Sequence, residues 1–176
     1  MPDKASEPTR PLSLTKFSDR LVLPPALRPA RGRSGAYGTL RIRMRSARMR
    51  LHSDLPPSDV WAYECHLPGP TIEVRRSQRV QIEWINAIPA DAPHPVTAVT
   101  APDPDEGALP ERIPQNRPGR SGGRINDALK RVPPWAVVHV HGGRIAANYD
   151  GWTENGILSG QSLLCRYEND QPATLL

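Results

Sequence analysis

Aromatic residues make up only 5% of the 176 residues, with a single phenylalanine. The chain has two cysteines, Cys65 and Cys165, which exclude a disulfide-rich scaffold and which we expect to be free, small and buried. No apolar run approaches transmembrane length, and residues 1–8 lack the apolar core of a signal peptide, so we expect a cytoplasmic protein without a membrane partner. By contrast, the chain contains 21 prolines, which argue against long helices and predict many loops.

Positive charge is concentrated near the amino terminus. Residues 1–50 hold 12 Lys or Arg against three acids, a net charge of +9, so the remainder carries −4 of the total +5. Arginines alternate with apolar residues from Arg41 to Arg50, which is typical of a half-buried strand. A nucleic-acid surface is the alternative, but no aromatic platform accompanies these arginines, and we expect no nucleic-acid partner.

Alternation of apolar and polar residues predicts an all-β fold. The predicted strands, which we expect to pair antiparallel in a sandwich, cover residues 37–51, 60–63, 72–74, 80–86 and 161–167, with another through residues 135–141. The first should contain a bulge or bend between Arg45 and Arg48, because Met49 and Leu51 fall on the opposite parity from Ile42. Residues 1–36 are expected to form an arm, and residues 37–176 one domain. A long Pro- and Gly-rich loop at about 90–134, with a helical turn at 125–129, interrupts this domain.

A pair of histidines marks the candidate functional site. His139 and His141 end an apolar run and precede Gly142 and Gly143. On a strand, side chains two residues apart face the same way, roughly 6.6 to 7 Å apart at the backbone, and neutral imidazole is a common ligand of transition metals. The glycines permit a sharp turn or a close approach. The spacing alone leaves open zinc, iron, copper or two solvated imidazoles at a sheet edge.

Three segments together resemble a known family. Pro-Gly-Pro-Thr-Ile-Glu at 68–73, the strand ending at Trp84, and His-Val-His-Gly-Gly at 139–143 followed by Asp150-Gly151-Trp152 resemble the first cupredoxin domain of multicopper oxidases, especially phenoxazinone synthases and bacterial spore-coat laccases. The resemblance covers about residues 12–176. It implies a cupredoxin-like Greek-key β-sandwich.

The resemblance also implies copper as the cofactor. By motif, His139 matches a type 2 copper ligand and His141 a type 3 copper ligand, while Asp150 matches a catalytic acid that assists proton delivery to dioxygen. A carboxylate close to cations stays ionised and can relay protons without binding metal. The alternative for Asp150 is a turn-forming residue before Gly151. The implied reaction oxidises phenols or aminophenols while dioxygen is reduced to water.

The chain departs from the family pattern after residue 176. The second His-x-His motif of the first domain does not follow, and neither Cys65 nor Cys165 lies in the His-Cys-His context of a type 1 copper ligand. We therefore expect a sandwich that is incomplete at its carboxyl end, an inactive chain when alone, and a possible complementing C-terminal chain. The alternative is a stand-alone copper-binding β module without oxidase activity.

Overall fold

The computed structural model describes residues 13–30, 36–92, 94 and 132–172. The all-β prediction is confirmed for this part of the chain, whose elements are strands apart from one short 3-10 turn. There, no helix is long and apolar enough to cross a membrane. Most of the loop predicted at 90–134, including the helical turn at 125–129, lies outside the described residues. The elements are β1 (Ala26–Leu27), β2 (Gly38–Met49), β3 (Ser58–Tyr63), β4 (Thr71–Ile72), β5 (Val80–Asn86), β6 (Trp135–Ala136), η2 (Ala147–Tyr149), β7 (Ile157–Leu158) and β8 (Ser162–Tyr167).

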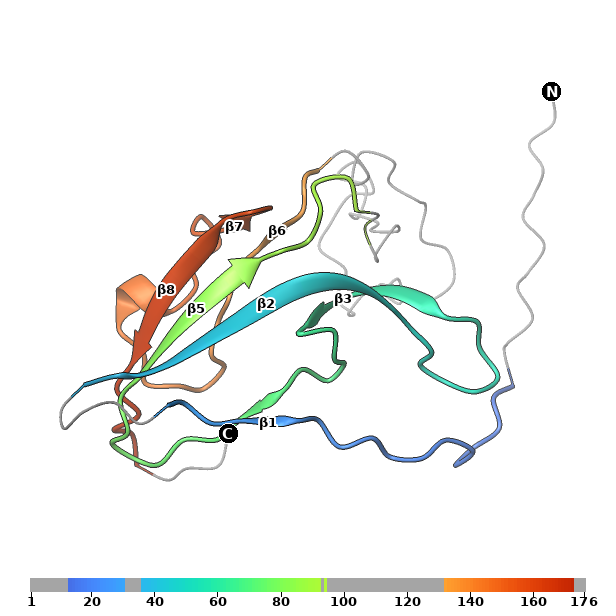
Figure 1. Ribbon diagram of the computed structural model, residues 1–176, viewed down its shortest axis with the longest axis horizontal. Helices are drawn as coiled ribbons and strands as arrows, with labels where there is room; N and C mark the ends of the chain where they lie inside the picture. Colours follow the sequence, from blue (N-terminus) through green and yellow to red (C-terminus); the bar gives the residue numbers. More distant parts are fainter. Residues whose placement is uncertain (1–12, 31–35, 93, 95–131, 173–176) are drawn as a thin grey trace, which may run out of the picture.

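The main layer is a four-stranded sheet in the order β3-β2-β5-β8 (Figure 1). β2 pairs antiparallel with β3, and β5 pairs antiparallel with β8, as predicted. The central pair, β2 and β5, is parallel, so the prediction of uniformly antiparallel pairing is wrong. Alternation reveals which face of a strand is buried, but it carries no information on the direction of the neighbouring strand.

β2 is long enough to serve two partners. Its first half pairs with β5 up to Met44, and from Met44 to Met49 it pairs with β3 in an unbroken register. The predicted bulge between Arg45 and Arg48 is therefore absent. Met49 is half-buried and Leu51 is exposed, so the strict alternation of buried residues in β2 ends after Met44, where β2 stops pairing with β5.

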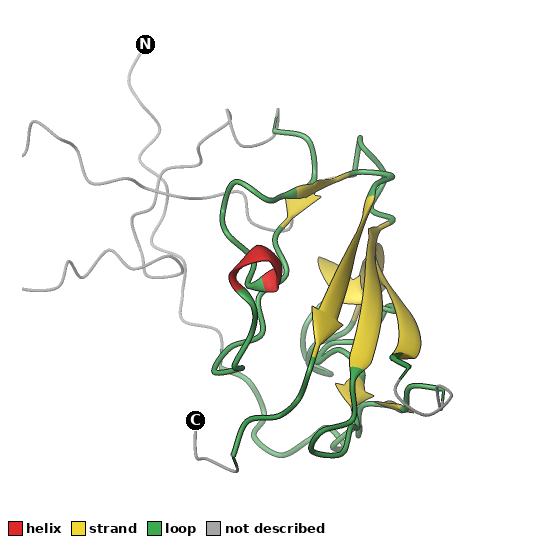
Figure 2. Cartoon of the chain, turned by 90° about the vertical axis from the view of Figure 1, so that its left-hand side faces the viewer, coloured by secondary structure: helices red, strands yellow, loops and turns green. Residues whose placement is uncertain are grey.

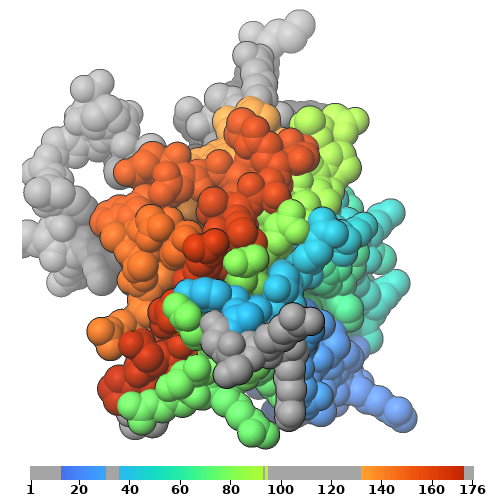
Figure 3. All heavy atoms as spheres, turned by 60° about the vertical axis from the view of Figure 1, so that its left-hand side comes forward, coloured from blue at the N-terminus to red at the C-terminus, as the bar shows by residue number. Residues whose placement is uncertain are grey.

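One face of the main sheet carries the core. Inward residues of β2, β5 and β8 are spaced two apart, and they are joined there by Ile88, Val138 and Ile157. Figure 3 shows β8, β5 and β2 side by side, so segments distant in the sequence pack against each other. The strand residues of this core are Ile42, Met44, Val80, Ile82, Trp84, Cys165 and Tyr167.

The second layer is built from short pieces. β1 pairs in parallel with β4, and β6 pairs antiparallel with β7 (Figure 2). Two predicted strands end earlier than expected: β4 ends at Ile72 and not at residue 74, and β6 ends at Ala136 and not at residue 141. Of the two cysteines, which are both free, Cys165 is buried as predicted, whereas Cys65 is exposed in a turn with a positive φ of 60°.

Candidate metal site

His139 follows β6 in a segment outside any strand, and His141 lies in the turn that comes directly after it. Their ring centroids are 6.3 Å apart, with the planes inclined by 44°. The segment ends in a tight turn, in which the Gly143 amide donates to the Val140 carbonyl at 3.1 Å and Gly142 has a φ of 74°. The strand prediction for these histidines is wrong, but the two rings are close neighbours, and the glycine turn predicted after them is present.

Asp150 contacts the imidazole ring of His139 at its Nδ1 atom. The Nδ1 atom of His139 lies 2.6 Å from the backbone carbonyl oxygen of Asp150 and 3.4 Å from its Oδ1 carboxylate oxygen. A carbonyl oxygen can only accept, so Nδ1 carries the proton, which leaves the Nε2 lone pair available. Metal-binding histidines have this arrangement, in which the second nitrogen donates to a carbonyl or carboxylate.

Gly151 is a site residue that the sequence reasoning missed. It has a φ of 80°, and a Cβ there would lie 2.2 Å from the carbonyl oxygen of Val138. The absent side chain thus lets the Asp150 loop pack directly against the backbone that carries His139. The Asp-Gly dipeptide is a turn signal that could have indicated this close approach.

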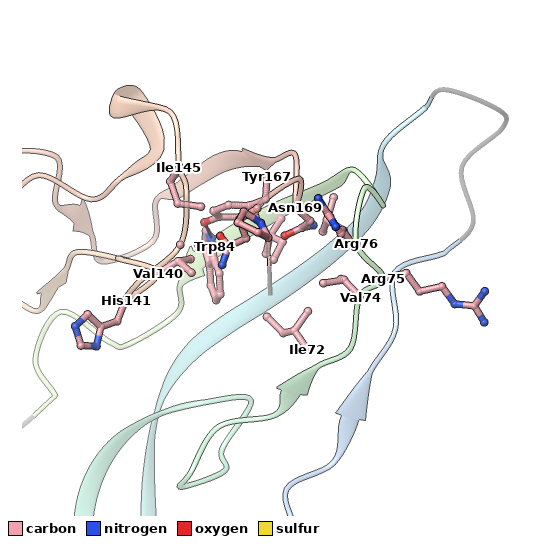
Figure 4. A pocket seen from close by; sticks show the side chains of 15 residues that line it. Ile72, Val74, Arg75, Arg76, Trp84, Val140, His141, Ile145, Tyr167 and Asn169 are labelled. Atoms are coloured by element: carbon pink, nitrogen blue, oxygen red, sulfur yellow. Dashed lines mark hydrogen bonds between the residues drawn. The ribbon is translucent and has the colours of Figure 1, made fainter. Parts of the chain in front are cut away.

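His141 lies on the wall of a cavity. The cavity has a volume of about 500 Å³ and is lined mainly by apolar residues from β4, β5 and β8 and by the turn after His139. In Figure 4, Val140 and His141 lie on one side of the group of lining residues, with the His141 ring pointing outward, and Trp84 and Tyr167 lie in the middle of that group. One histidine therefore borders open space next to the apolar core.

These residues fit part of a metal site. Two imidazoles, one with a fixed tautomer, suit copper or zinc. Within the described residues, no group of three or more His, Cys, Asp or Glu side chains gathers around a common point. His139 and His141 are therefore the candidate donors that the sequence motif predicts, and Asp150 contacts the Nδ1 atom of His139.

Each of the other three histidines has a ring nitrogen close to a backbone carbonyl oxygen. His52 Nε2 lies 3.0 Å from the Thr15 carbonyl, His66 Nδ1 lies 2.7 Å from the Glu64 carbonyl, and His94 Nε2 lies 2.6 Å from the Val132 carbonyl. Glu73 forms an ion pair with Arg28 at 2.6 Å. Each of these side chains therefore has a partner within the fold.

The sequence of this chain is similar to those of bacterial laccases. It is 30% identical over 143 residues to a laccase of Bacillus subtilis and 29% identical over 143 residues to a laccase of Bacillus stratosphericus, in each case over 81% of this chain. No protein-family model matches. Over most of its own length, the chain is homologous to the laccases and related multicopper oxidases.

A further relative extends the comparison to plants. "Multicopper oxidase LPR1 homolog 5" of rice is 33% identical over 152 residues, which is 80% of this chain. The chain spans 23% of each of the two Bacillus laccases and 19% of the rice protein, so it corresponds to part of such an oxidase. A solved multicopper oxidase from Campylobacter jejuni aligns with 91% of this chain and 27% of its own, with a TM-score of 0.47 and 13% identity.

Proposed function

We propose that this chain supplies two ligands of a copper centre in a laccase-like multicopper oxidase, His139 to a type 2 copper and His141 to a type 3 copper. The observation that carries the proposal is the contact of His139 Nδ1 with the Asp150 carbonyl at 2.6 Å. It orients the ring and leaves Nε2 as a lone-pair donor. The homology to laccases favours copper over the other metals that accept imidazole.

The residues of this chain position donors and a proton carrier. The turn at Gly142 and Gly143 holds His141 beside His139, and Gly151 lets the Asp150 carbonyl reach the His139 ring. The Asp150 carboxylate, 3.4 Å from His139 Nδ1, is close enough to the site to relay protons there. When bound, copper would supply the one-electron chemistry that couples oxidation of phenols or aminophenols to reduction of dioxygen.

Copper binding by the purified chain tests the proposal. In the isolated chain, which lacks the other ligands of both coppers, we expect the two rings, with centroids 6.3 Å apart, to share about one copper and to give a nitrogen signature in the electron paramagnetic resonance spectrum. His139→Ala and His141→Ala should each abolish the signal, and His66→Ala should not, because His66 contacts its own loop. No binding at micromolar copper, or equal binding by all three variants, would contradict the ligand assignment.

Activity separates the two candidate functions. Two imidazoles are far fewer than a complete oxidase centre needs, so we expect no oxygen consumption with an aminophenol from this chain alone. A chain that binds copper tightly and stays inactive when complementing polypeptide is added would favour the stand-alone copper-binding module. Turnover by the isolated chain would contradict both candidates.

A further inference from the structure

A short turn lies between the candidate metal site and β7, and it ends in Asn155 and Gly156. The backbone amide of Asn155 donates to the Trp152 carbonyl at 2.9 Å, which closes the turn. The Asn155 side chain is exposed and makes no hydrogen bond within the part of the chain that the structure describes. The backbone amide of Gly156 likewise donates to no acceptor there. An unengaged carboxamide therefore precedes an unengaged backbone nitrogen.

These features favour attack of the Gly156 nitrogen on the Asn155 side chain. The attack needs a backbone conformation that a side chain on the following residue would obstruct, and glycine has none. A new bond between the Gly156 nitrogen and Cγ of Asn155 closes a succinimide ring. The bond from Cγ to Nδ2 breaks, and Nδ2 leaves as ammonia with the proton from the Gly156 amide. Water then opens the ring at either carbonyl, which yields aspartate or isoaspartate.

The other asparagines among the described residues lack this combination of features. Asn86 and Asn169 each donate a hydrogen bond from Nδ2 to a backbone carbonyl. Asn148 is exposed, but the next residue is Tyr149, which has a bulky side chain and a backbone amide engaged in a hydrogen bond of 2.8 Å. Exposure, a free carboxamide and a following glycine therefore coincide at Asn155.

Isoaspartate at position 155 would change the path of the chain into β7. It carries the main chain through its side-chain carbons, so the backbone gains one methylene group before Gly156. The space beside Gly156 is already filled, because an added Cβ there would lie 2.2 Å from Cε3 of Trp135. The next residue, Ile157, is 3% exposed, and its carbonyl accepts from Nδ2 of Asn86 at 2.8 Å. The longer backbone therefore strains the contacts of β7 with Trp135 and Asn86.

We propose that Asn155 is a site of spontaneous deamidation through a succinimide, and that the isoaspartate product loosens the β6–β7 pair. Because His139 lies shortly after β6, the change reaches the segment that carries the candidate copper ligands. The modification needs water and no metal. It goes beyond the copper proposal, because neither histidine takes part in it.

Incubation of the full chain in mildly alkaline buffer with chelator tests the reactivity of Asn155. Trypsin then releases residues 145–166 as one peptide, which contains both Asn148 and Asn155, so mass spectrometry compares the two sites within one molecule. We expect Asn155 to convert at least about tenfold faster than Asn148, into a mixture of aspartate and isoaspartate. Equal rates at the two sites, or no conversion at Asn155, would overturn the proposal.

Hydrogen exchange tests the structural consequence. The isoaspartate form, separated by chromatography, should exchange the amides of residues 135–136 and 157–158 about tenfold faster than the fresh chain. Asn155→Asp is the matched control, because it adds the same charge without lengthening the backbone, and it should exchange like the fresh chain. An isoaspartate form that exchanges like Asn155→Asp would contradict the loosening of β6 and β7. Because chelator is present throughout, these results are independent of the copper assignment.

Discussion

Two glycines with the same backbone conformation occupy opposite environments. Gly151 and Gly160 have φ values of 80° and 79°, but an added Cβ meets the Val138 carbonyl oxygen at 2.2 Å in Gly151 and nothing within 4 Å in Gly160. The left-handed conformation alone costs an alanine about 1 to 2 kcal/mol. Gly151 therefore has a steric requirement that Gly160 lacks.

We expect Gly160→Ala to lower the free energy of unfolding by about 1 kcal/mol and Gly151→Ala to lower it by clearly more. Gly151→Ala should also weaken copper binding, because the Asp150 carbonyl must move away from His139. Urea denaturation and copper titration of both variants give the comparison. Equal stability losses with unchanged copper binding would show that the close approach at Gly151 has no role in the site.

Asn86 is the buried polar side chain of the described residues, with 0% exposure. Its Nδ2 donates to the carbonyls of Ile157 at 2.8 Å and Pro134 at 3.2 Å, and its Oδ1 accepts from the Ile88 amide at 3.1 Å. One side chain thus joins β5 of the main sheet to both strands of the β6–β7 region. We infer that it sets where the second layer docks.

Replacing Asn86 by Ala should leave three buried backbone groups without these partners. We expect a loss of about 3 kcal/mol in unfolding free energy, since an unsatisfied buried group costs about 1 to 3 kcal/mol. Gln81→Ala, on the other face of the same strand, should change stability by less than about 0.5 kcal/mol. Chemical denaturation measures both, and similar losses would contradict the docking role.

At the level of elements, the amino-terminal arm is attached through the β2–β3 turn. His52 Nδ1 accepts from the Asp54 amide at 3.0 Å, so the proton lies on Nε2, which donates to the Thr15 carbonyl at 3.0 Å. The Thr15 amide in turn donates to the Asp54 carboxylate at 2.8 Å. This hydrogen bond lowers the pKa of Asp54, so the carboxylate stays charged in mildly acidic solution.

His52→Ala should release this part of the arm. Trypsin cleavage after Lys16 and Arg20 is expected to become several-fold faster, because proteolysis follows local opening. His66→Ala serves as the control, since His66 contacts only its own loop. Cleavage at the same rate in the wild type and in His52→Ala would mean that other contacts hold the arm.

For the whole molecule, buried acids determine the response to alkali. Burial raises the pKa of Tyr167 above its ordinary value of 10.0, and it also raises the pKa of Tyr63 and of the Cys165 thiol above its ordinary 9.0. Above those ordinary values, the unfolded chain releases protons that the folded chain retains. The unfolded state then binds fewer protons, so stability falls as pH rises.

We expect the unfolding free energy to be insensitive to these groups below about pH 9 and to fall at higher pH. Tyr167→Phe should reduce the slope above about pH 10, although it loses the hydrogen bond from Trp84. Denaturant unfolding over a pH series measures the slope. A variant whose slope equals that of the wild type would exclude Tyr167 as a source of the alkaline effect.

The strands of the main sheet could be predicted from the sequence, whereas the conformation of the segment that carries His139 could not. The alternation in β2, β5 and β8 predicts these strands to within a few residues, because one face of each is buried in the core. The apolar run before His139 resembles a strand equally well, yet among the described residues only Trp135 and Ala136 of this run pair with another strand. A strand needs a neighbour for its backbone groups, and local sequence does not reveal whether one is present.

The sequence by itself determined the all-β class, the buried faces of the main strands and the histidine motif, because each depends on residues close together in the chain. Tertiary structure decided the parallel pairing of β2 with β5, the contact of His139 with Asp150, and the position of His141 on the wall of the cavity. These features depend on where the chain returns after its turns. Packing of distant segments fixes that path, and no local pattern encodes it.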